Sequence, residues 1–196
     1  MDSRTFIFTG NSGSGKGTQA KLLQKYLLEK DADKSVYYLE TGSLFREFFK
    51  GKDYTHDLAQ EIYERGERQP GFLAIHMWSH ALIRGMEEGG HLLVDGTPRS
   101  LNEAHIFDTA MEFYRRENPF VIYVNVPRAW SRKHLLARGR EDDTREQVEK
   151  RLDWFEEDVM PAIEFFKEYS RYMFIEVNGD QTIEEVHKEI LSKIEN

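Results

Sequence analysis

The sequence predicts a three-layer α/β fold in which helices flank a five-stranded parallel sheet. Short apolar segments alternate with segments of helical periodicity along nearly the whole chain, and this alternation is typical of right-handed strand–helix–strand crossovers. Residues 120–124 form an unbroken apolar run, as expected for a parallel strand that is buried on both faces. A glycine-rich turn separates the first apolar segment from the first helix. In such folds, ligands bind beyond the carboxyl ends of the strands.

The turn from Gly10 to Thr18 has the Gly-x-x-x-x-Gly-Lys spacing of a phosphate-binding loop, or P-loop. Glycines allow several backbone N–H groups to converge on one anion, and the helix that follows adds its positive N-terminal end. Lys16 adds a charge that can reach the β- and γ-phosphates. We therefore expect a P-loop fold that binds a nucleoside triphosphate. The expected ligands are Gly13, Ser14, Gly15, Lys16, Gly17 and Thr18.

The residue after the P-loop lysine is Gly17, where this motif usually carries a magnesium-binding Ser or Thr. The hydroxyl of Thr18 comes one residue later, about 100° further round a helix, and so cannot take the same role. We therefore expect Mg²⁺ to be held mainly by phosphates and by waters that a carboxylate orders.

The first half of the chain is predicted to contain three strands. Apolar residues 6–8 form the first, β-branched and aromatic residues 36–39 the second, and residues 91–96 the third, which ends in a carboxylate, Asp95. The first helix begins in the P-loop. Further helices are expected at residues 43–49, 53–66 and 71–88.

The second half is predicted to add the central strand at residues 120–124 and a last strand at 172–177. The longest apolar stripe in a helix is that of Val148, Leu152, Phe155, Val159 and Ile163, which follows a Thr144–Gln147 capping box. Pro161 is expected to bend this helix. The other predicted helices lie at residues 101–116, 127–138, with Pro127 in the first turn, and 183–194.

Composition limits the possible partners. The chain has 196 residues and 39% hydrophobic residues, enough for one domain with its own core. Its net charge of −8 argues against a general nucleic-acid or membrane-surface binder. It has no cysteine, no signal-like segment and no apolar run long enough to cross a membrane. We expect a single domain over 1–196 that is cytoplasmic and monomeric.

Three more polar segments lie near predicted strand ends or helix ends. They are Thr41–Arg46, Asp95–Arg99, and Arg138–Asp143 together with Arg151. With the P-loop, they resemble in order the G-x-x-G-x-G-K-G-T, T-G-D-x-x-R, D-G-x-P-R and R-x-D-D motifs of the adenylate kinase family. The resemblance covers nearly the whole chain. It implies a nucleoside monophosphate kinase that uses ATP and Mg²⁺ and gives ADP and a nucleoside diphosphate.

The resemblance also implies roles for single residues. Arg46 and Arg99 would hold the acceptor phosphate, Arg138, Arg140 and Arg151 would surround the transferred group, and Asp95 would order the magnesium waters. Arginine suits this chemistry because its planar, permanently charged group binds phosphate oxygens in pairs. The implied catalytic residues are Lys16, Arg99, Arg138, Arg140 and Arg151. The implied monophosphate site contains Thr41, Arg46, Gly96, Arg99, Glu103, Arg140 and Arg151, within a helical acceptor subdomain at 41–72, and His134 and Arg138 join the P-loop in the ATP site.

Simpler interpretations remain for several of these residues. Thr41 could be an ordinary helix cap, Asp95 a strand-end cap, and Arg140 and Asp143 a structural ion pair. His134 stands where the family commonly has an arginine that stacks on the donor adenine. It could stack in the same way or be a plain surface histidine.

The chain departs from the family pattern at the lid. Only Gly139 separates Arg138 from Arg140, where the family has an insertion, so residues 138–144 are expected to form a minimal lid. Incomplete closure predicts measurable ATP hydrolysis, because closure shields the transferred group from water. In addition, Ser43 replaces the Asp of T-G-D.

The chain also departs from the family pattern at the position that reads the acceptor base, where Glu103 replaces the family glutamine. An ionised carboxylate only accepts hydrogen bonds, which fits guanine or cytosine better than adenine. Thr41, in contrast, matches the adenylate type. AMP is therefore the first acceptor we expect, with CMP, UMP or GMP as alternatives. A small-metabolite kinase is the next alternative, followed by a GTPase switch, for which the guanine motif is missing, and a non-catalytic nucleotide sensor.

Overall fold

The computed structural model describes residues 3–140, 142–169 and 171–195. The described residues form a parallel five-stranded sheet in the order β2-β3-β1-β4-β5. The strands are β1 (Thr5–Thr9), β2 (Val36–Glu40), β3 (His91–Asp95), β4 (Phe120–Asn125) and β5 (Met173–Asn178). The α-helices are α1 (Lys16–Lys30), α2 (Thr41–Phe48), α3 (Tyr54–Glu64), α4 (Gly71–Gly85), α5 (Leu101–Phe113), α6 (Arg128–Arg138), α7 (Arg145–Trp154), α8 (Met160–Glu168) and α9 (Ile183–Ile194). The predicted α/β fold with a parallel sheet is thus confirmed.

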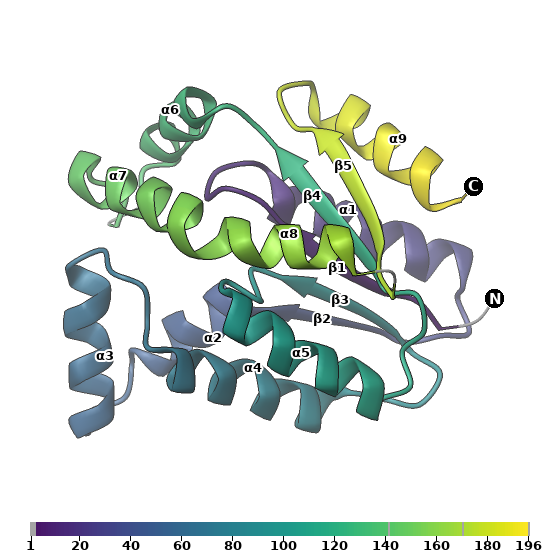
Figure 1. The fold of residues 1–196 in the computed structure, drawn as a ribbon, viewed down its shortest axis with the longest axis horizontal. Helices are drawn as coiled ribbons and strands as arrows, with labels where there is room; N and C mark the ends of the chain where they lie inside the picture. The colour runs from purple at the N-terminus through teal and green to yellow at the C-terminus, as the bar shows by residue number, and fades with distance from the viewer. Residues whose placement is uncertain (1–2, 141, 170, 196) are drawn as a thin grey trace.

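Two apolar clusters pack on opposite faces of the sheet and define the three layers. On one face, Phe8 of β1 packs with Leu23 of α1 and Ile190 of α9. On the other, Ile7 packs with Trp78 of α4, Phe107 of α5 and Phe166 of α8. Figure 1 shows α1 and α9 on one side of the strands and α4, α5 and α8 on the other. Phe6, Ile7 and Phe8 are fully buried, as the double-sided burial of a central parallel strand requires.

The segment between Thr144 and Glu168 differs from the predicted single bent helix. Thr144 caps α7, accepting a hydrogen bond from the Gln147 N–H at 3.3 Å, which is one half of the predicted capping box; the Gln147 side chain accepts from the Thr144 hydroxyl at 3.1 Å and not from its N–H. The chain then changes to a π-helical segment, η1 (Phe155–Val159), before α8. Pro161 has no N–H to donate, and its ring crowds the backbone carbonyl one turn earlier. The π-helical turn, which is wider than an α-helical one, lies directly before this proline. All five residues of the predicted apolar stripe are buried.

Strand register fixes where the polar strand ends lie. Asp95 at the end of β3 pairs with Phe8 of β1 and with Glu40 at the end of β2. The P-loop leaves β1 next to Asp95, and Glu40 lies one strand further along the sheet. Pro127, expected inside a helix, instead precedes α6 as its N-cap residue. The end of β4 therefore leads directly into α6, the helix that carries His134 and Arg138.

Candidate functional site

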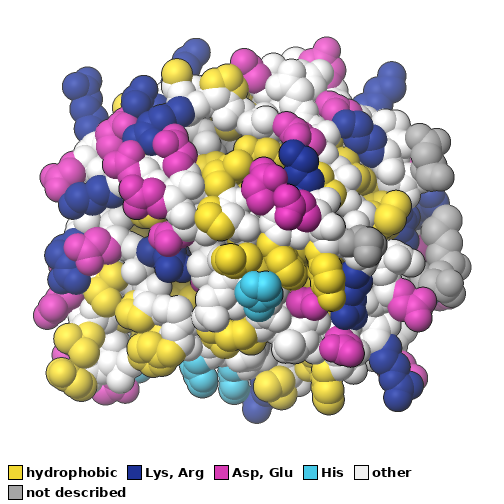
Figure 2. Space-filling view, in the orientation of Figure 1, with side chains coloured by type: hydrophobic (Ala, Val, Ile, Leu, Met, Phe, Trp, Pro, Cys, Tyr) yellow, Lys and Arg dark blue, Asp and Glu magenta, His cyan; other side chains and the backbone are white. Residues whose placement is uncertain are grey.

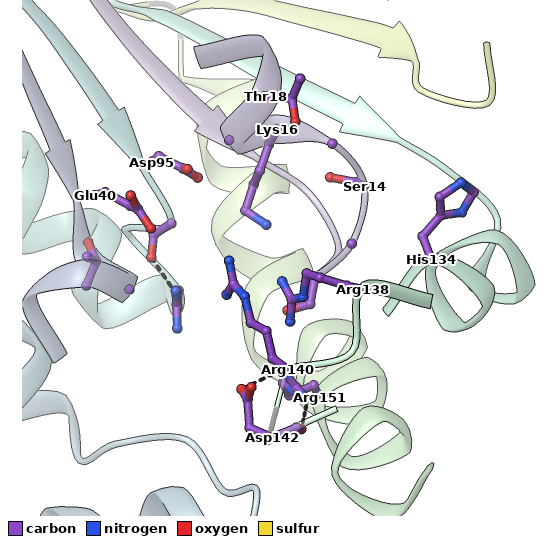
Figure 3. Close-up of a pocket in the computed structure, with 18 of the residues that line it drawn as sticks. Ser14, Lys16, Thr18, Glu40, Asp95, His134, Arg138, Arg140, Asp142 and Arg151 are labelled. Atoms are coloured by element: carbon purple, nitrogen blue, oxygen red, sulfur yellow. Dashed lines mark hydrogen bonds and ion pairs between the residues drawn. The ribbon is translucent and has the colours of Figure 1, made fainter. Parts of the chain in front are cut away.

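A cleft of about 1120 Å³ opens above the carboxyl ends of the strands. It is lined by the P-loop, the ends of β2 and β3, the segment between α3 and α4, and the turn from α6 to α7 (Figure 3). The ATP-site, monophosphate-site, metal-site and catalytic residues predicted from the sequence all line it. They are Gly13, Ser14, Gly15, Lys16, Gly17, Thr18, Thr41, Arg46, Asp95, Gly96, Arg99, Glu103, His134, Arg138, Arg140 and Arg151. The fold thus brings residues that are up to 138 positions apart into one cavity.

The P-loop backbone depends on its glycines. Gly10 has a φ of 141°, and a Cβ there would lie 2.5 Å from the carbonyl oxygen of Val124. Gly15 has a φ of 89° and precedes the first turn of α1. Both conformations disfavour side chains, and they direct the N-terminal N–H groups of α1 to the cleft. The hydroxyl of Ser14 is buried without a hydrogen-bond partner among the described residues.

Lys16 lies among positive charges. Its Nζ donates to the backbone carbonyl of Asn11 at 3.2 Å. Burial, together with the nearby Arg99, Arg138 and Arg140, lowers the pKa of Lys16 to about 8, although Asp95 acts in the opposite direction. Figure 3 shows its side chain extending into the space that Arg138 and Arg140 also border. A polyanion in this space would relieve the repulsion and restore the ordinary pKa.

Asp95 provides a carboxylate at the floor of the cleft. Its Oδ2 accepts a hydrogen bond from the Tyr38 hydroxyl at 3.0 Å, and burial and this carboxylate together raise the pKa of Tyr38. A Cβ at Gly17 would lie 2.9 Å from the same oxygen, so the glycine makes room for the carboxylate. Hard oxygen donors of this kind fit Mg²⁺ bound through water. No group of three His, Cys, Asp or Glu side chains among the described residues could hold a metal ion directly.

Thr41 and Arg46 are positioned by α2. Thr41 is the first residue of the helix, while Glu40 occupies the N-cap. The Thr41 hydroxyl caps nothing and is buried without a partner in the described part of the chain, which disfavours the helix-cap interpretation. The guanidinium of Arg46 pairs with Glu40 at 2.6 Å. A phosphate would therefore have to compete with this carboxylate for Arg46.

Arg99 is held over the floor of the cleft by backbone and aromatic groups. Its Nε donates to the carbonyl of Gly96, and its guanidinium lies 5.9 Å from the ring centroid of Trp154. Burial lowers the pKa of Arg99, while Glu103 and Asp95 partly offset that effect. No carboxylate among the described residues makes an ion pair with it. The site can therefore accept an anion there.

The turn between α6 and α7 is stabilised by two aspartates. Asp143 accepts from Arg138 at 2.7 and 2.8 Å and from Arg151 at 3.0 Å, and Arg151 also pairs with Asp142 at 3.0 Å. Burial opposes ionisation of Asp143, but the hydrogen bond and charge of Arg138 lower its pKa overall. Asp142 and Asp143 thus hold the side chains of Arg138 and Arg151 in place.

Arg140 does not form the side-chain pair with Asp143 that the sequence left open. Only its backbone N–H contacts that carboxylate, at 3.2 Å. Its guanidinium makes no ion pair within the described residues, and burial together with Arg138 and Arg46 lowers its pKa. Arg140 is therefore available to a ligand. The neighbouring Glu141 lies outside the described residues.

His134 lies at the edge of the cleft, stacked on Trp130. The ring centroids are 3.4 Å apart and the ring planes differ by 20°, and His134 Nδ1 lies 2.9 Å from the Trp130 carbonyl. Both residues line the cleft. Trp130 was not singled out from the sequence, because a tryptophan on an amphipathic helix is usually core. The pair forms an aromatic platform that a planar base can stack on.

Glu103 and Arg68 occupy the acceptor side of the cleft. Glu103 is 1% exposed and lies three residues after Ser100, the N-cap of α5. Its carboxylate accepts from Thr97 at 3.1 Å and from Arg68 at 3.3 Å. Arg68 belongs to no motif, so the sequence reasoning missed it. Only the spatial neighbourhood of Glu103 identifies it.

Comparison with known proteins gives a consistent result. The family model described as adenylate kinase matches residues 8–171. The adenylate kinase of Prochlorococcus marinus strain MIT 9301 is 30% identical over 89% of this chain and 90% of its own, and that of strain MIT 9515 is 32% identical over the same shares. The uridylate kinase of Saccharomyces cerevisiae is 29% identical over 98% of this chain and 92% of its own.

Proposed function

The chain belongs to the adenylate kinase family and is a nucleoside monophosphate kinase, and we propose that it transfers the γ-phosphoryl group of ATP to a nucleoside monophosphate. One observation carries this proposal. Lys16 and the guanidinium groups of Arg46, Arg99, Arg138, Arg140 and Arg151 border one cleft in a chain of net charge −8. Such a concentration of cations suits two polyanions that would otherwise repel each other.

We assign the two nucleotides to opposite walls. The P-loop residues 13–18 would bind the ATP phosphates, with Arg138 beside them and the His134 platform under the donor base. Thr41, Arg46, Gly96, Arg99 and Glu103 would form the monophosphate site, in which residues 41–72 are the acceptor subdomain. Arg140 and Arg151 would bridge the two sites, within a minimal lid at 138–144.

The reaction needs positioning and charge stabilisation more than acid–base chemistry. An oxygen of the acceptor phosphate attacks the γ-phosphorus of ATP, and the bond from that phosphorus to the bridging oxygen of ADP breaks. Lys16 and the arginines hold both phosphates in line and stabilise the charge on the transferred group. Mg²⁺, bound to phosphates and to waters that Asp95 orders, would neutralise further charge.

Further assignments concern the acceptor base, the location and the oligomeric state. AMP is the first acceptor to test, because most of the similar proteins named above are adenylate kinases and Thr41 matches that type. UMP, CMP and GMP are the alternatives, and one similar protein is a uridylate kinase. A cytoplasmic location and a monomeric state stay predictions. Among the described residues, no helix has the length and apolar character needed to cross a membrane.

A transfer assay tests the proposal. The protein would be incubated with ATP, Mg²⁺ and each of AMP, UMP, CMP and GMP, and the diphosphates would be separated by chromatography. With AMP we expect two ADP for each ATP consumed, and with any other usable acceptor equal amounts of ADP and the new diphosphate. Lys16→Met should reduce kcat at least about 100-fold, whereas Lys25→Met, an exposed lysine of the same helix, should not change it. Folded wild-type protein that phosphorylates no monophosphate would contradict the proposal.

A further inference from the structure

Arg68 is a cation at the acceptor end of the cleft that no motif accounts for. It lies in the segment between α3 and α4, and its side chain is 26% exposed. Two carboxylates from different elements hold it. Nη1 donates to Glu103 of α5 at 3.3 Å, and Nε pairs with Asp158 of η1 at 3.1 Å. It is also close enough to Arg99 to lower the pKa of that guanidinium. Arg68 is therefore a fixed part of the cleft wall.

The carboxylate of Glu103 is already used within the protein. One oxygen accepts from Thr97, and the other accepts from Arg68 and, at 3.5 Å, from Ser100. Both oxygens of Glu103 already accept hydrogen bonds from the protein, which leaves few free lone pairs for the donors of a base. We therefore expect Glu103 to act on the base through Arg68 and not by direct contact. The Nη2 amino group of Arg68 makes no hydrogen bond to any residue that the structure describes. The group offered to a ligand is thus a donor.

The next residue, Gln69, offers the complementary group. Its Nε2 donates to the carbonyl of Ala59 at 2.8 Å, which fixes the orientation of the amide. Its Oε1 is buried and has no hydrogen-bond partner in the described part of the chain. Gln69 lines the same cleft. A buried acceptor without a partner is costly unless a ligand donates to it.

Arg68 and Gln69 are consecutive residues that both line the cleft, and a donor and an acceptor on the same wall fit one class of base edge. Uracil and guanine present a keto oxygen, which accepts, next to a ring N–H, which donates. Adenine and cytosine present an amino group next to an unprotonated ring nitrogen. Their amino donor would then face the Arg68 donor, and their ring acceptor would face the Gln69 acceptor. Arginine commonly pairs with the O6 of guanine for this reason.

We propose that Arg68, held by Glu103 and Asp158, determines acceptor specificity and, with Gln69, extends the acceptor range to monophosphates of keto bases, namely UMP and GMP. This inference rests on the proposed phosphoryl transfer to a nucleoside monophosphate. Arg68 touches the base and none of the reacting atoms, so its effect falls on the choice of acceptor.

The test compares acceptors, not total activity. For wild-type protein and Arg68→Met, kcat/KM would be measured with AMP, CMP, UMP and GMP at saturating ATP. We expect wild type to use UMP or GMP, and Arg68→Met to lower kcat/KM for these two by about tenfold or more while AMP and CMP change by less than about twofold. The matched control is Arg65→Met, an arginine three residues away that pairs with Glu67 and does not line the cleft.

Two further measurements separate specificity from damage to the fold. Calorimetric titration of UMP into the protein without ATP should show the same weakening in Arg68→Met but not in Arg65→Met. Asp158→Asn keeps Arg68 and Glu103 but removes one of the two charges that hold Arg68, and should also lower the ratio of UMP to AMP turnover. Asp158 does not line the cleft, so this variant decides the question if Arg68→Met unfolds.

The failures are distinguishable. A wild-type protein that phosphorylates no monophosphate would overturn the proposed function. Transfer to AMP with no use of UMP or GMP would overturn only the role of Arg68. An equal loss with all four acceptors in Arg68→Met would also overturn it, because a structural role moves every substrate together.

Discussion

Some of the arginines in the cleft are neutralised by carboxylates when no ligand is present, and others are not. Lys16 faces three arginines and one aspartate, and burial adds to the cost of its charge. Arg46 and Arg151 are neutralised by Glu40 and by Asp142 and Asp143, whereas Arg99 and Arg140 make no carboxylate pair among the described residues. The charge state of Lys16 is therefore the most sensitive to an incoming phosphate.

We predict that ATP binding takes up a proton above neutral pH. The pKa of Lys16, lowered to about 8 in the free protein, rises when a polyphosphate binds, so the free protein holds fewer protons than the complex above pH 8. Affinity should fall by up to about tenfold per pH unit from pH 8 upward. Calorimetry at pH 8.5 in buffers of different ionisation enthalpy would measure the uptake. The uptake should be absent in Lys16→Met and present in Lys25→Met; no uptake in wild type would contradict the assignment.

The close approach of Gly17 to Asp95 gives a second prediction at the residue scale. A Cβ at Gly17 would lie 2.9 Å from Asp95 Oδ2, so Gly17→Ala should displace the carboxylate that we propose orders the magnesium waters. We expect kcat to fall about tenfold or more and the Mg²⁺ concentration for half-maximal rate to rise. The control is Gly71→Ala, since no atom lies within 4 Å of a Cβ at that position. Equal magnesium dependence in the two variants would contradict this role of Gly17.

The limits of sequence reasoning are visible at particular residues. The positions of Lys16, Arg46 and Arg99 in the cleft were predicted from motifs that follow strand ends. The carboxyl ends of parallel strands lie at one edge of the sheet, so these motifs meet there. Arg68 was missed because an arginine in a short loop carries no periodic signal. The partners of Glu103 were missed because Thr97, Ser100 and Arg68 meet it only in the folded chain. Assignments of hydrogen-bond partners need tertiary structure.

At the scale of elements, the turn between α6 and α7 has the clearest functional consequence. Gly139 ends α6 in the left-handed conformation with a φ of 67°, and Thr144 already caps α7. This turn is too short to form a separate cover over the cleft. Asp142 and Asp143 of the turn instead hold Arg138 and Arg151 in place, while the Arg140 guanidinium makes no ion pair among the described residues. We therefore expect the protein to rely on preset charges more than on the closure of a flap.

A short turn predicts leakage of the reaction to water. Without acceptor, wild-type protein should hydrolyse ATP measurably, since water can reach the γ-phosphate. The release of inorganic phosphate would be followed with Lys16→Met as the background. Adding a usable monophosphate should suppress the hydrolysis, because the acceptor takes the place of water. A wild-type rate equal to that of Lys16→Met would show that the site excludes water after all.

Element prediction was limited mainly by local irregularities. Every predicted strand is present, because each is an apolar run bounded by turn residues. The π-helical segment η1 was not predicted, although Pro161 indicated a disturbance there. A one-residue insertion in the hydrogen-bond pattern leaves the apolar stripe buried and so leaves no trace in the periodicity.

At the scale of the whole molecule, the sheet order β2-β3-β1-β4-β5 concentrates positive charge in an acidic protein. The P-loop strand β1 lies between β3, which ends in Asp95, and β4, which leads to α6. On the face shown in Figure 2, charged side chains of both signs are interspersed. The cleft therefore attracts phosphates locally while the net charge disfavours general polyanion binding.

The central claim is that this cleft holds two nucleotides end to end and passes a phosphoryl group directly between them. ³¹P NMR of wild-type protein with ATP, Mg²⁺ and a monophosphate measures this most directly, because it follows ATP, nucleoside diphosphates and inorganic phosphate in one spectrum. The account predicts that two nucleoside diphosphates appear for each ATP consumed by wild type, and that this production nearly vanishes in Arg99→Met. Loss of the γ-phosphate only to inorganic phosphate, with no new diphosphate from any monophosphate, would contradict it.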